Sequence, residues 1–268
     1  MREAPVVEGP RPSLRDFRSS FEERLEAREL MDEPEADPVL LKRTMEQFRG
    51  INERISMAAR RFASLFFPQM EGGREYRLVD VGSGGCDIPM DIVRRARRRG
   101  LRLSVLALDR DERMVRWARE ALSDYPEIEV RRAEAGELES FGASDFVISN
   151  HLLHHLSRRE IGAFLSAADR SARMGFILDD LRRSPWSWLG YSVYAGLFAR
   201  GSFALYDGRL SIRRGFRRPE LEAILAETGQ GAGIEVFEAL PGRIGFLRRS
   251  PRDPGHRLLR PAANEGSN

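Results

Sequence analysis

The chain of 268 residues contains a single cysteine, Cys86, and a single lysine, Lys42. One thiol excludes an internal disulfide, and its place in a glycine-rich turn favours a small tolerated side chain over a nucleophile. No apolar run approaches the roughly 20 residues that a membrane span requires, and no signal-peptide core follows the N-terminal residues. These absences predict a cytoplasmic protein without stable membrane insertion.

Positive charge is carried almost entirely by arginine. Lysine and arginine together number 44 against 41 acidic residues, for a net charge of +3. Because the arginines alternate with carboxylates along the chain, we expect a solvated surface of mixed sign and no nucleic-acid partner. A hydrophobic content of 41% is that of an ordinary globular protein. The length suits one α/β catalytic domain with appendages.

The sequence divides into a core domain and three appendages. The first residues combine several prolines with little apolar periodicity, which indicates a mobile arm. From about Phe21, apolar residues recur at helical intervals until Phe67 and Pro68. The predicted parts are a flexible arm (1–20), a helical N-terminal extension (21–70), the catalytic domain (71–250) with a lid insertion at about 181–215, and a flexible tail (251–268).

The catalytic domain alternates predicted strands with predicted helices. This alternation is typical of a doubly wound, mostly parallel sheet, here of seven strands. Ser157 and Glu160 have the spacing of a capping box and mark the start of one helix. The predicted strands are 76–81, 103–108, 128–131, 145–149, 174–178, 234–237 and 243–247, and the predicted helices include 88–99, 114–122 and 219–227.

A glycine-rich turn follows the first strand, in Val79-Asp80-Val81-Gly82-Ser83-Gly84-Gly85-Cys86-Asp87. A buried strand, a glycine turn and a helix together bind an adenosine-containing ligand at the carboxyl ends of parallel strands. Asp109 ends the next strand, at a spacing that lets one carboxylate accept hydrogen bonds from both ribose hydroxyls.

Asp87 separates two ligand classes that share this layout. In the dinucleotide fingerprint the third glycine would fall at this position, where the helix N-terminus binds a diphosphate. A carboxylate repels a diphosphate and suits a ligand with positive charge, such as S-adenosylmethionine. Asp87 as a helix N-cap is an equally weighted interpretation, which blocks the phosphate just as well.

At this segment the chain resembles the class I S-adenosylmethionine-dependent methyltransferases, over roughly residues 77–247. The resemblance implies that Gly82 and Gly84 line the methionine moiety, that Asp109 binds the ribose and that Arg110 flanks the adenine. It also implies that Glu134 lies near the adenine amino group. The cofactor-binding residues expected on this basis are Asp80, Gly82, Ser83, Gly84, Asp87, Asp109, Arg110, Glu134, Ala135 and Asn150.

Three histidines follow the fourth strand in Asn150-His151-Leu152-Leu153-His154-His155-Leu156. Methyl transfer is a direct displacement that depends on alignment, and a base is needed only for an acceptor that retains its proton. His151 is the first candidate for a base or a hydrogen bond to the acceptor, and His154 the second. The alternative is that His154 and His155 are structural. No metal site is predicted, because the glutamate of His-Glu-x-x-His and a third ligand are missing.

The aromatic stretch from Trp186 to Tyr206, between the fifth strand and the last helix, predicts a lid over the acceptor. The Pro-Pro-aromatic turn of the methyltransferases that act on nucleobases is absent after the fourth strand, which disfavours a nucleobase acceptor. The lid aromatics could form an apolar slot, although packing on the core and a role of the tryptophans at a membrane surface are alternatives. The predicted acceptor-binding residues are His151, Arg182, Trp186, Tyr206 and Arg213.

Outer segments, including Glu29-Leu30-Met31-Asp32 and residues 206–214, resemble a bacterial group of quinone-biosynthesis-like methyltransferases associated with type III polyketide synthases. This resemblance implies O-methylation of a phenolic, pyrone or quinol-type small molecule with S-adenosylmethionine as cofactor. An NAD(P)-dependent oxidoreductase and a non-catalytic cofactor-binding protein of the same fold are the alternatives. The oligomeric state is left open, with a homodimer as one alternative.

Overall fold

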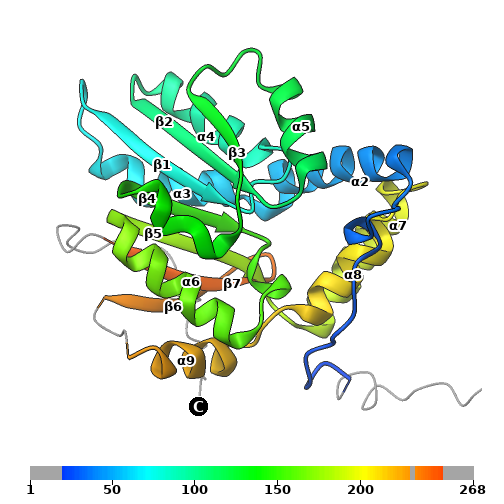
Figure 1. The fold of residues 1–268 in the computed structure, drawn as a ribbon. Coiled ribbons are helices and arrows are strands. Elements are labelled where there is room, and N and C mark those ends of the chain that lie inside the picture. Colours follow the sequence, from blue (N-terminus) through cyan, green and yellow to red (C-terminus); the bar gives the residue numbers. More distant parts are fainter. Residues whose placement is uncertain (1–19, 230–232, 250–268) are drawn as a thin grey trace, which may run out of the picture.

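The computed structural model describes residues 20–229 and 233–249 of the chain (Figure 1). The arm predicted at residues 1–20 falls outside the described residues except for Ser20, and the tail predicted at 251–268 falls outside them entirely. Within the described ranges, no helix combines the length and the apolar character that crossing a membrane requires.

One seven-stranded sheet organises the protein, in the order β3-β2-β1-β4-β5-β7-β6. Strand β7 runs antiparallel to both of its neighbours, and the other strands pair in parallel. The predicted mostly parallel, doubly wound sheet is therefore confirmed. The strands are β1 (Glu75–Val81), β2 (Arg102–Asp109), β3 (Ile128–Arg132), β4 (Ser144–Asn150), β5 (Ala172–Leu181), β6 (Ile234–Ala239) and β7 (Arg243–Arg249).

Helices cover both faces of the sheet, because successive side chains of each strand point to opposite faces. Leu78 of β1 packs in a cluster with α3, α4 and α5, whereas its neighbour Val79 packs in a cluster with α6 and α9. The helices are α2 (Pro38–Ile51), α3 (Ala58–Phe66), α4 (Asp87–Arg98), α5 (Glu112–Ala121), α6 (Arg158–Ser171), α7 (Pro185–Phe198), α8 (Ala204–Arg214) and α9 (Arg218–Glu227), with short turns η1 (Leu30–Asp32), η2 (Asn52–Ser56), η3 (Phe67–Gln69), η4 (Ala135–Phe141) and η5 (Leu153–His155).

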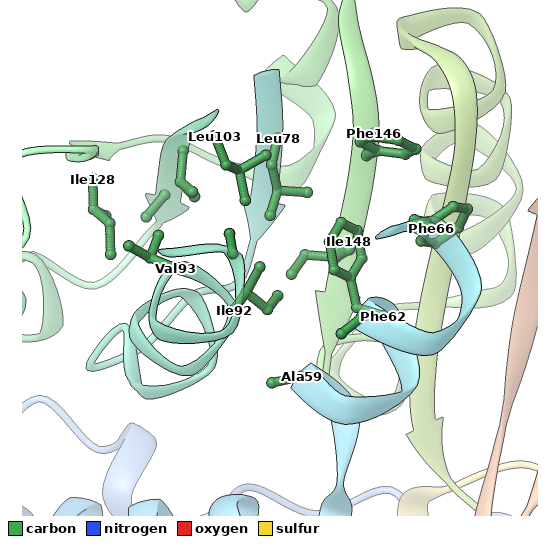
Figure 2. Close-up of a cluster of buried hydrophobic side chains, with 14 of the residues drawn as sticks. Ala59, Phe62, Phe66, Leu78, Ile92, Val93, Leu103, Ile128, Phe146 and Ile148 are labelled. Atoms are coloured by element: carbon green, nitrogen blue, oxygen red, sulfur yellow. The ribbon is translucent and has the colours of Figure 1, made fainter. Parts of the chain in front are cut away.

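Helix α3 attaches the N-terminal extension to the sheet through aromatic side chains (Figure 2). The ring centroids of Phe62 and Phe66 lie 5.7 Å and 5.0 Å from that of Phe146 on β4. Such pairs stabilise a fold by about 0.5–1.5 kcal/mol beyond the area they bury. This helix therefore packs as part of the core of the sheet domain.

Local signals set the helix starts. The carboxylate of Asp37 accepts hydrogen bonds from Val39 and Leu40, directly before Pro38 at the first position of α2. Ser157 and Glu160 form the reciprocal capping box predicted for α6. These two starts place α2 beside the crevice and α6 behind β4.

The segment from Phe21 to Asp37 differs from the helix predicted there, because only the short turn η1 is helical. Its backbone groups bond to other elements instead. The carbonyl of Phe21 accepts from Arg183, and the amides of Leu30 and Met31 donate to Asp207. Tertiary hydrogen bonds thus replace the helical ones along this segment, which we call the N-terminal strap (residues 21–37).

The insertion between β5 and α9 forms helices α7 and α8, as the lid prediction required. Figure 1 shows them gathered with α2 near the carboxyl ends of the parallel strands. Tyr191 of α7 donates a hydrogen bond to the carbonyl of Ala204 at the start of α8, at 2.5 Å. Helices α7 and α8 thus join the strap and α2 in closing one side of the crevice.

Candidate functional site

Two adjoining cavities open where β1, β2 and β4 end. Their volumes are about 470 Å³ and 560 Å³, and Gly82, Gly84 and His151 line both of them. Strand β1 lies between β2 and β4, so the chain reverses its direction of winding at this point. Open α/β sheets bind ligands in the crevice at such a switch point. We call the 470 Å³ cavity the acceptor cavity and the 560 Å³ cavity the adenosine cavity.

The glycine turn between β1 and α4 has the backbone that its sequence predicts. Gly82 and Gly84 have φ angles of 76° and 51°, in the region that favours glycine. The amides of Gly82 and Ser83 both donate to the carbonyl of Leu108 on β2, at 2.8 Å and 3.0 Å. Cys86 is fully buried, and this burial raises the pKa of its thiol, so the reactive thiolate is disfavoured.

Asp109 lies at the end of β2, where the ribose-binding carboxylate was predicted. Its two oxygens accept hydrogen bonds from the amides of Gly84 and Asp111, at 2.7 Å and 2.9 Å. The carboxylate therefore fixes the glycine turn while it lines the adenosine cavity. Each predicted cofactor residue lines at least one cavity: Asp80, Gly82, Ser83, Gly84, Asp87 and Asn150 the acceptor cavity, and Gly82, Gly84, Asp109, Arg110, Glu134 and Ala135 the adenosine cavity.

Two carboxyl groups, the buried Asp80 and the partly buried Asp87, lie at the junction with the glycine turn. Burial, together with the nearby Asp87 and Asp109, raises the pKa of Asp80 well above its usual range. Burial also raises the pKa of Asp87, and among the described residues its Oδ2 atom has no hydrogen-bond partner. A cationic ligand group would stabilise the ionised form of Asp80 and give the Oδ2 atom of Asp87 a partner. The ammonium group of S-adenosylmethionine therefore fits these residues, whereas a diphosphate does not.

The structure corrects the alternative interpretation of Asp87. Cys86 occupies the N-cap position of α4, and Asp87 is the first residue of the helix. Cys86 has a φ of 61°, and its side chain makes no capping hydrogen bond. The Asp87 carboxylate is thus positioned as a lining group of the acceptor cavity.

His151 follows β4 in a left-handed conformation, with a φ of 60°, and only Leu153–His155 forms a helical turn. The three histidines therefore do not share one helix face. The Nη1 atom of Arg243 lies 3.0 Å from Nε2 of His151, and other guanidinium atoms bond to Asn150 and Asp179. Burial and the Arg243 charge lower the pKa of His151 well below its usual range, so the ring is neutral.

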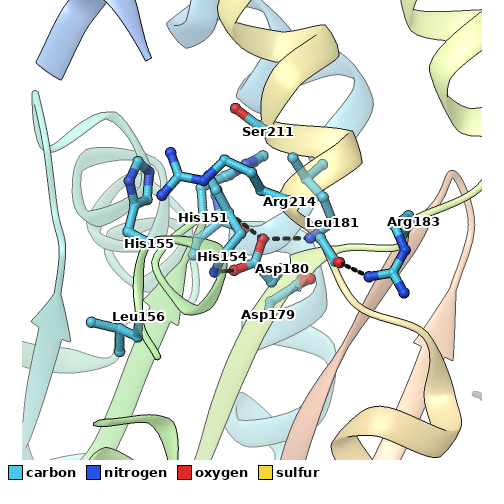
Figure 3. Close-up of polar contacts among 12 residues, drawn as sticks. His151, His154, His155, Leu156, Asp179, Asp180, Leu181, Arg183, Ser211 and Arg214 are labelled. Carbon is cyan, nitrogen blue, oxygen red and sulfur yellow. Dashed lines mark hydrogen bonds and ion pairs between the residues drawn. The ribbon is translucent and has the colours of Figure 1, made fainter. Parts of the chain in front are cut away.

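His154 is buried between two carboxylates (Figure 3). Its Nδ1 atom lies 2.7 Å from Asp180 on β5, and its Nε2 atom lies 3.4 Å from Glu29 on the N-terminal strap. Burial alone would lower the pKa of His154, but these two carboxylates outweigh it and raise the pKa to about 9. In the ligand-free protein this imidazole is therefore charged and cannot accept a proton.

His155 repeats this arrangement beside it. Its Nδ1 atom lies 3.3 Å from Asp32, and its Nε2 atom lies 3.9 Å from the same Oε1 atom of Glu29. Arg24 fixes the strap over the two histidines by donating to the carbonyls of His154 and Leu156. Glu29, His154 and His155 all line the acceptor cavity.

The predicted acceptor-binding residues are not brought together. Trp186 and His151 line the acceptor cavity. Arg182 pairs instead with Glu238, Arg213 lies over the ring of Phe21, and the Tyr206 side chain is 54% exposed. These three residues line neither cavity, because each faces away from the crevice on its own element.

Several residues of the site escaped the sequence analysis. Arg243 begins β7, and its neighbours in the sequence gave no sign of a buried charge. Tyr191 falls within the predicted lid and Asp180 directly before it, and no sequence pattern singles out either residue. Glu29 lies about 120 residues before the histidines that it meets. Only a prediction of which distant segments touch could have identified it.

Comparison with known families gives one match. A family model described as a methyltransferase domain matches residues 78–175, from β1 into β5. The matched stretch contains the glycine turn, Asp109, Glu134 and the three histidines. A search of the curated proteins finds no match.

Solved structures share the fold at low sequence identity. The plantazolicin methyltransferase BpumL in complex with SAH is 10% identical, with a TM-score of 0.60 over 82% of this chain and 94% of that one. A magnesium protoporphyrin IX methyltransferase from Synechocystis PCC 6803 with bound SAH is 16% identical, with a TM-score of 0.51 over 82% and 91%. A SAM dependent methyltransferase from Aquifex aeolicus is 19% identical, with a TM-score of 0.52 over 79% and 97%.

Proposed function

We propose that the chain is a class I S-adenosylmethionine-dependent methyltransferase and that it methylates an oxygen atom of a small phenolic, pyrone or quinol-type acceptor. One observation carries the proposal. The acceptor cavity is lined both by two carboxyl groups with the glycine turn and by aromatic residues with a histidine cluster. A methyl donor bound at the carboxyl groups would meet an acceptor bound among the aromatic residues.

The cofactor residues supply charge and shape. Asp80 and Asp87 would pair with the ammonium group, Gly82 and Gly84 would let the backbone approach the methionine moiety, and Asp109 would bind the ribose. Once bound, the cofactor supplies a methyl group on a sulfonium, open to direct displacement by an oxygen lone pair. The enzyme's own task is to align that oxygen.

The acceptor end suits a small planar molecule. A cavity of about 470 Å³ lies within the range of small-molecule sites. The strap, α2, α7 and α8 bound it with apolar and aromatic side chains, which would pack against the faces of a ring. The lining residues of this kind are Met31, Phe48, Trp186, Tyr191, Tyr194 and Ile212.

His151 would position the acceptor. A guanidinium only donates hydrogen bonds, so Nε2 of the neutral imidazole accepts from Arg243 and Nδ1 carries the ring proton. The remaining polar atom of His151 is thus a donor, suited to an acceptor oxygen. This assignment replaces the general-base role with a positioning role.

Product analysis tests the proposed reaction. The protein would be incubated with methyl-labelled S-adenosylmethionine and separate panels of phenols, pyrones and quinols, and the methylated atom would be located by NMR. We expect label on an oxygen atom, with one S-adenosylhomocysteine formed per methyl group transferred. Label on carbon or nitrogen, or no transfer while S-adenosylhomocysteine still stabilises the protein against heat, would reject this acceptor class.

His151→Ala tests the positioning role. We expect kcat to fall about tenfold, with unchanged affinity for S-adenosylhomocysteine and an unchanged shape of the pH profile of kcat. His151→Asn, which retains a side-chain donor, should recover part of the loss. If the ascending limb of the pH profile disappears in His151→Ala, the residue is a base after all.

A further inference from the structure

A cluster of three side chains beside the acceptor cavity is arranged as the ligand set of a metal ion. The Oε1 atom of Glu29 and one ring nitrogen each of His154 and His155 all lie within 4.8 Å of one another. We propose that Glu29, His154 and His155 bind a divalent transition metal ion of the Zn²⁺ type. The sequence places two histidines side by side without a third ligand nearby, and the fold brings Glu29 to them from the strap.

The distances from Glu29 to the two imidazole rings are compatible with a shared centre. The Nε2 atoms of His154 and His155 lie 3.4 Å and 3.9 Å from Glu29 Oε1. Both separations exceed the normal length of a hydrogen bond, about 2.7–3.2 Å. Ligand atoms bound tetrahedrally to zinc, at about 2.0–2.1 Å from the metal, lie roughly 3.3–3.4 Å apart. A small inward movement of His155 would complete the geometry.

Each histidine has a carboxylate on its other nitrogen. Asp180 lies 2.7 Å from Nδ1 of His154, and Asp32 lies 3.3 Å from Nδ1 of His155. Histidines that bind a metal through one nitrogen usually donate the other N–H to a carboxylate or carbonyl, which fixes the ring orientation. The chain provides this support twice, from β5 and from the strap.

Glu29 is likewise positioned from outside the cluster. Ser211 on α8 donates a hydrogen bond to Oε1 at 2.7 Å, and Nη1 of Arg214 lies 3.4 Å from it. The Glu29 side chain is only 3% exposed, so little water competes for its carboxylate. Two histidines and one glutamate are a ligand set of catalytic zinc sites, which retain an open fourth position.

The open position would face the acceptor cavity, because all three ligands line it. A hydroxyl oxygen of the acceptor would coordinate there and lose its proton to water more readily. The oxygen lone pair then forms the bond to the methyl carbon, the carbon–sulfur bond breaks, and its electron pair stays on sulfur. This role in catalysis rests on the proposed O-methylation, whereas metal binding itself does not.

Metal titration of the full chain tests the site. The protein would be stripped with a chelator, dialysed and titrated with Zn²⁺ against a chromophoric competitor. We expect one ion per chain. Glu29→Gln and His155→Ala should each weaken zinc binding more than 100-fold. Asp32→Asn removes only the supporting carboxylate and should weaken it roughly 10- to 100-fold. Glu139→Gln, which changes an exposed carboxylate outside both cavities, is the control, with unchanged affinity.

Failure to retain zinc, or equal affinity in Glu29→Gln, His155→Ala and the parent protein, would overturn the assignment. Stabilisation of each variant by S-adenosylhomocysteine shows that it is folded, and Asp32→Asn keeps the test open should a ligand variant not fold.

The two proposals fail in different ways. Zinc bound as expected, with no methylation of phenols, pyrones or quinols, would reject the acceptor class and leave the metal site standing. Equal rates of methylation with and without zinc would reject its role in the reaction.

Discussion

The crevice has an adenosine end, formed by the glycine turn and Asp109, and an acceptor end, formed by the strap, the histidines and the lid. The two ends differ in which parts of the chain supply their residues. Gly82, Gly84 and Asp109 come from two neighbouring strands and the turns that follow them. Glu29, His154 and Ser211 come from the strap, a loop after β4 and the lid. A cofactor used across a family can be bound by one local motif, whereas an acceptor site assembled from distant segments can change with any of them.

Arg243 is a buried charge held between β4 and β5, so its removal should have the largest effect on stability. It is 2% exposed and pairs with Asp179, Asn150 and His151. We expect Arg243→Ala to lower the free energy of unfolding by about 3–5 kcal/mol, because it leaves buried polar groups uncompensated. Urea denaturation measures the loss.

Arg170→Ala is the control for this experiment, since Arg170 forms an exposed ion pair with Glu139 and should change stability little. A loss no greater than that of the control would show that the buried contacts of Arg243 do not stabilise the fold.

Asp109→Ala should weaken cofactor binding without affecting the acceptor end. The substitution removes the expected ribose contact and the hydrogen bond that the Gly84 amide donates. Two charge-assisted hydrogen bonds correspond to roughly 100-fold in affinity for S-adenosylhomocysteine, measured by calorimetry. Zinc affinity should be unchanged. The exposed Asp124→Ala is the control, and equal cofactor affinity in both variants would remove the ribose assignment.

The affinity for the cofactor should depend on pH, because one of the carboxyl groups expected to bind it has a shifted pKa. Burial and the nearby Asp87 and Asp109 raise the pKa of Asp80, so the ligand-free carboxyl group keeps its proton to a higher pH than an ordinary aspartate does. A cationic ligand favours the ionised form. Binding should therefore release a proton, and affinity should rise with pH by up to about tenfold per unit below that pKa.

Calorimetry in buffers of different ionisation enthalpy counts the protons released, and Asp80→Asn should release fewer. The folded pKa lies above the unfolded one, so the ligand-free protein should also lose stability as pH rises between the two values. Proton uptake on binding would contradict the expected release.

Trp186→Ala should have the smallest effect, at the outer edge of the acceptor end. The side chain lines the acceptor cavity but is 68% exposed. We expect KM for the acceptor to rise about threefold with kcat unchanged, and Trp186→Phe to restore it. A large fall in kcat would instead place Trp186 next to the reacting atoms.

The sequence predicted the sheet and the adenosine end because their signals are local. Strand alternation, the glycine turn and the Ser157–Glu160 capping box each depend on residues close together in the chain. The same reasoning misjudged the strap, where apolar spacing indicated a helix from Phe21. Its backbone bonds to Arg183 and Asp207 outweigh local preference, and no local pattern reports such contacts.

The acceptor end could be predicted only in part. His151 and Trp186 were placed correctly beside the crevice because they follow β4 and β5 closely. Arg182 and Arg213 were not, since their side chains turn toward Glu238 and Phe21. Glu29 could not be paired with the histidines, because the contact depends on where the strap crosses the fold.

The hydrogen bond between Glu29 and Ser211 spans 182 residues of sequence, and it has a consequence for synthesis on the ribosome. A chain emerging N-terminus first completes β1, β2 and the glycine turn well before α8 exists. All the residues predicted to bind the methyl donor are therefore synthesised before the lid. The acceptor site would be complete only after the lid has been translated and the strap has packed against it.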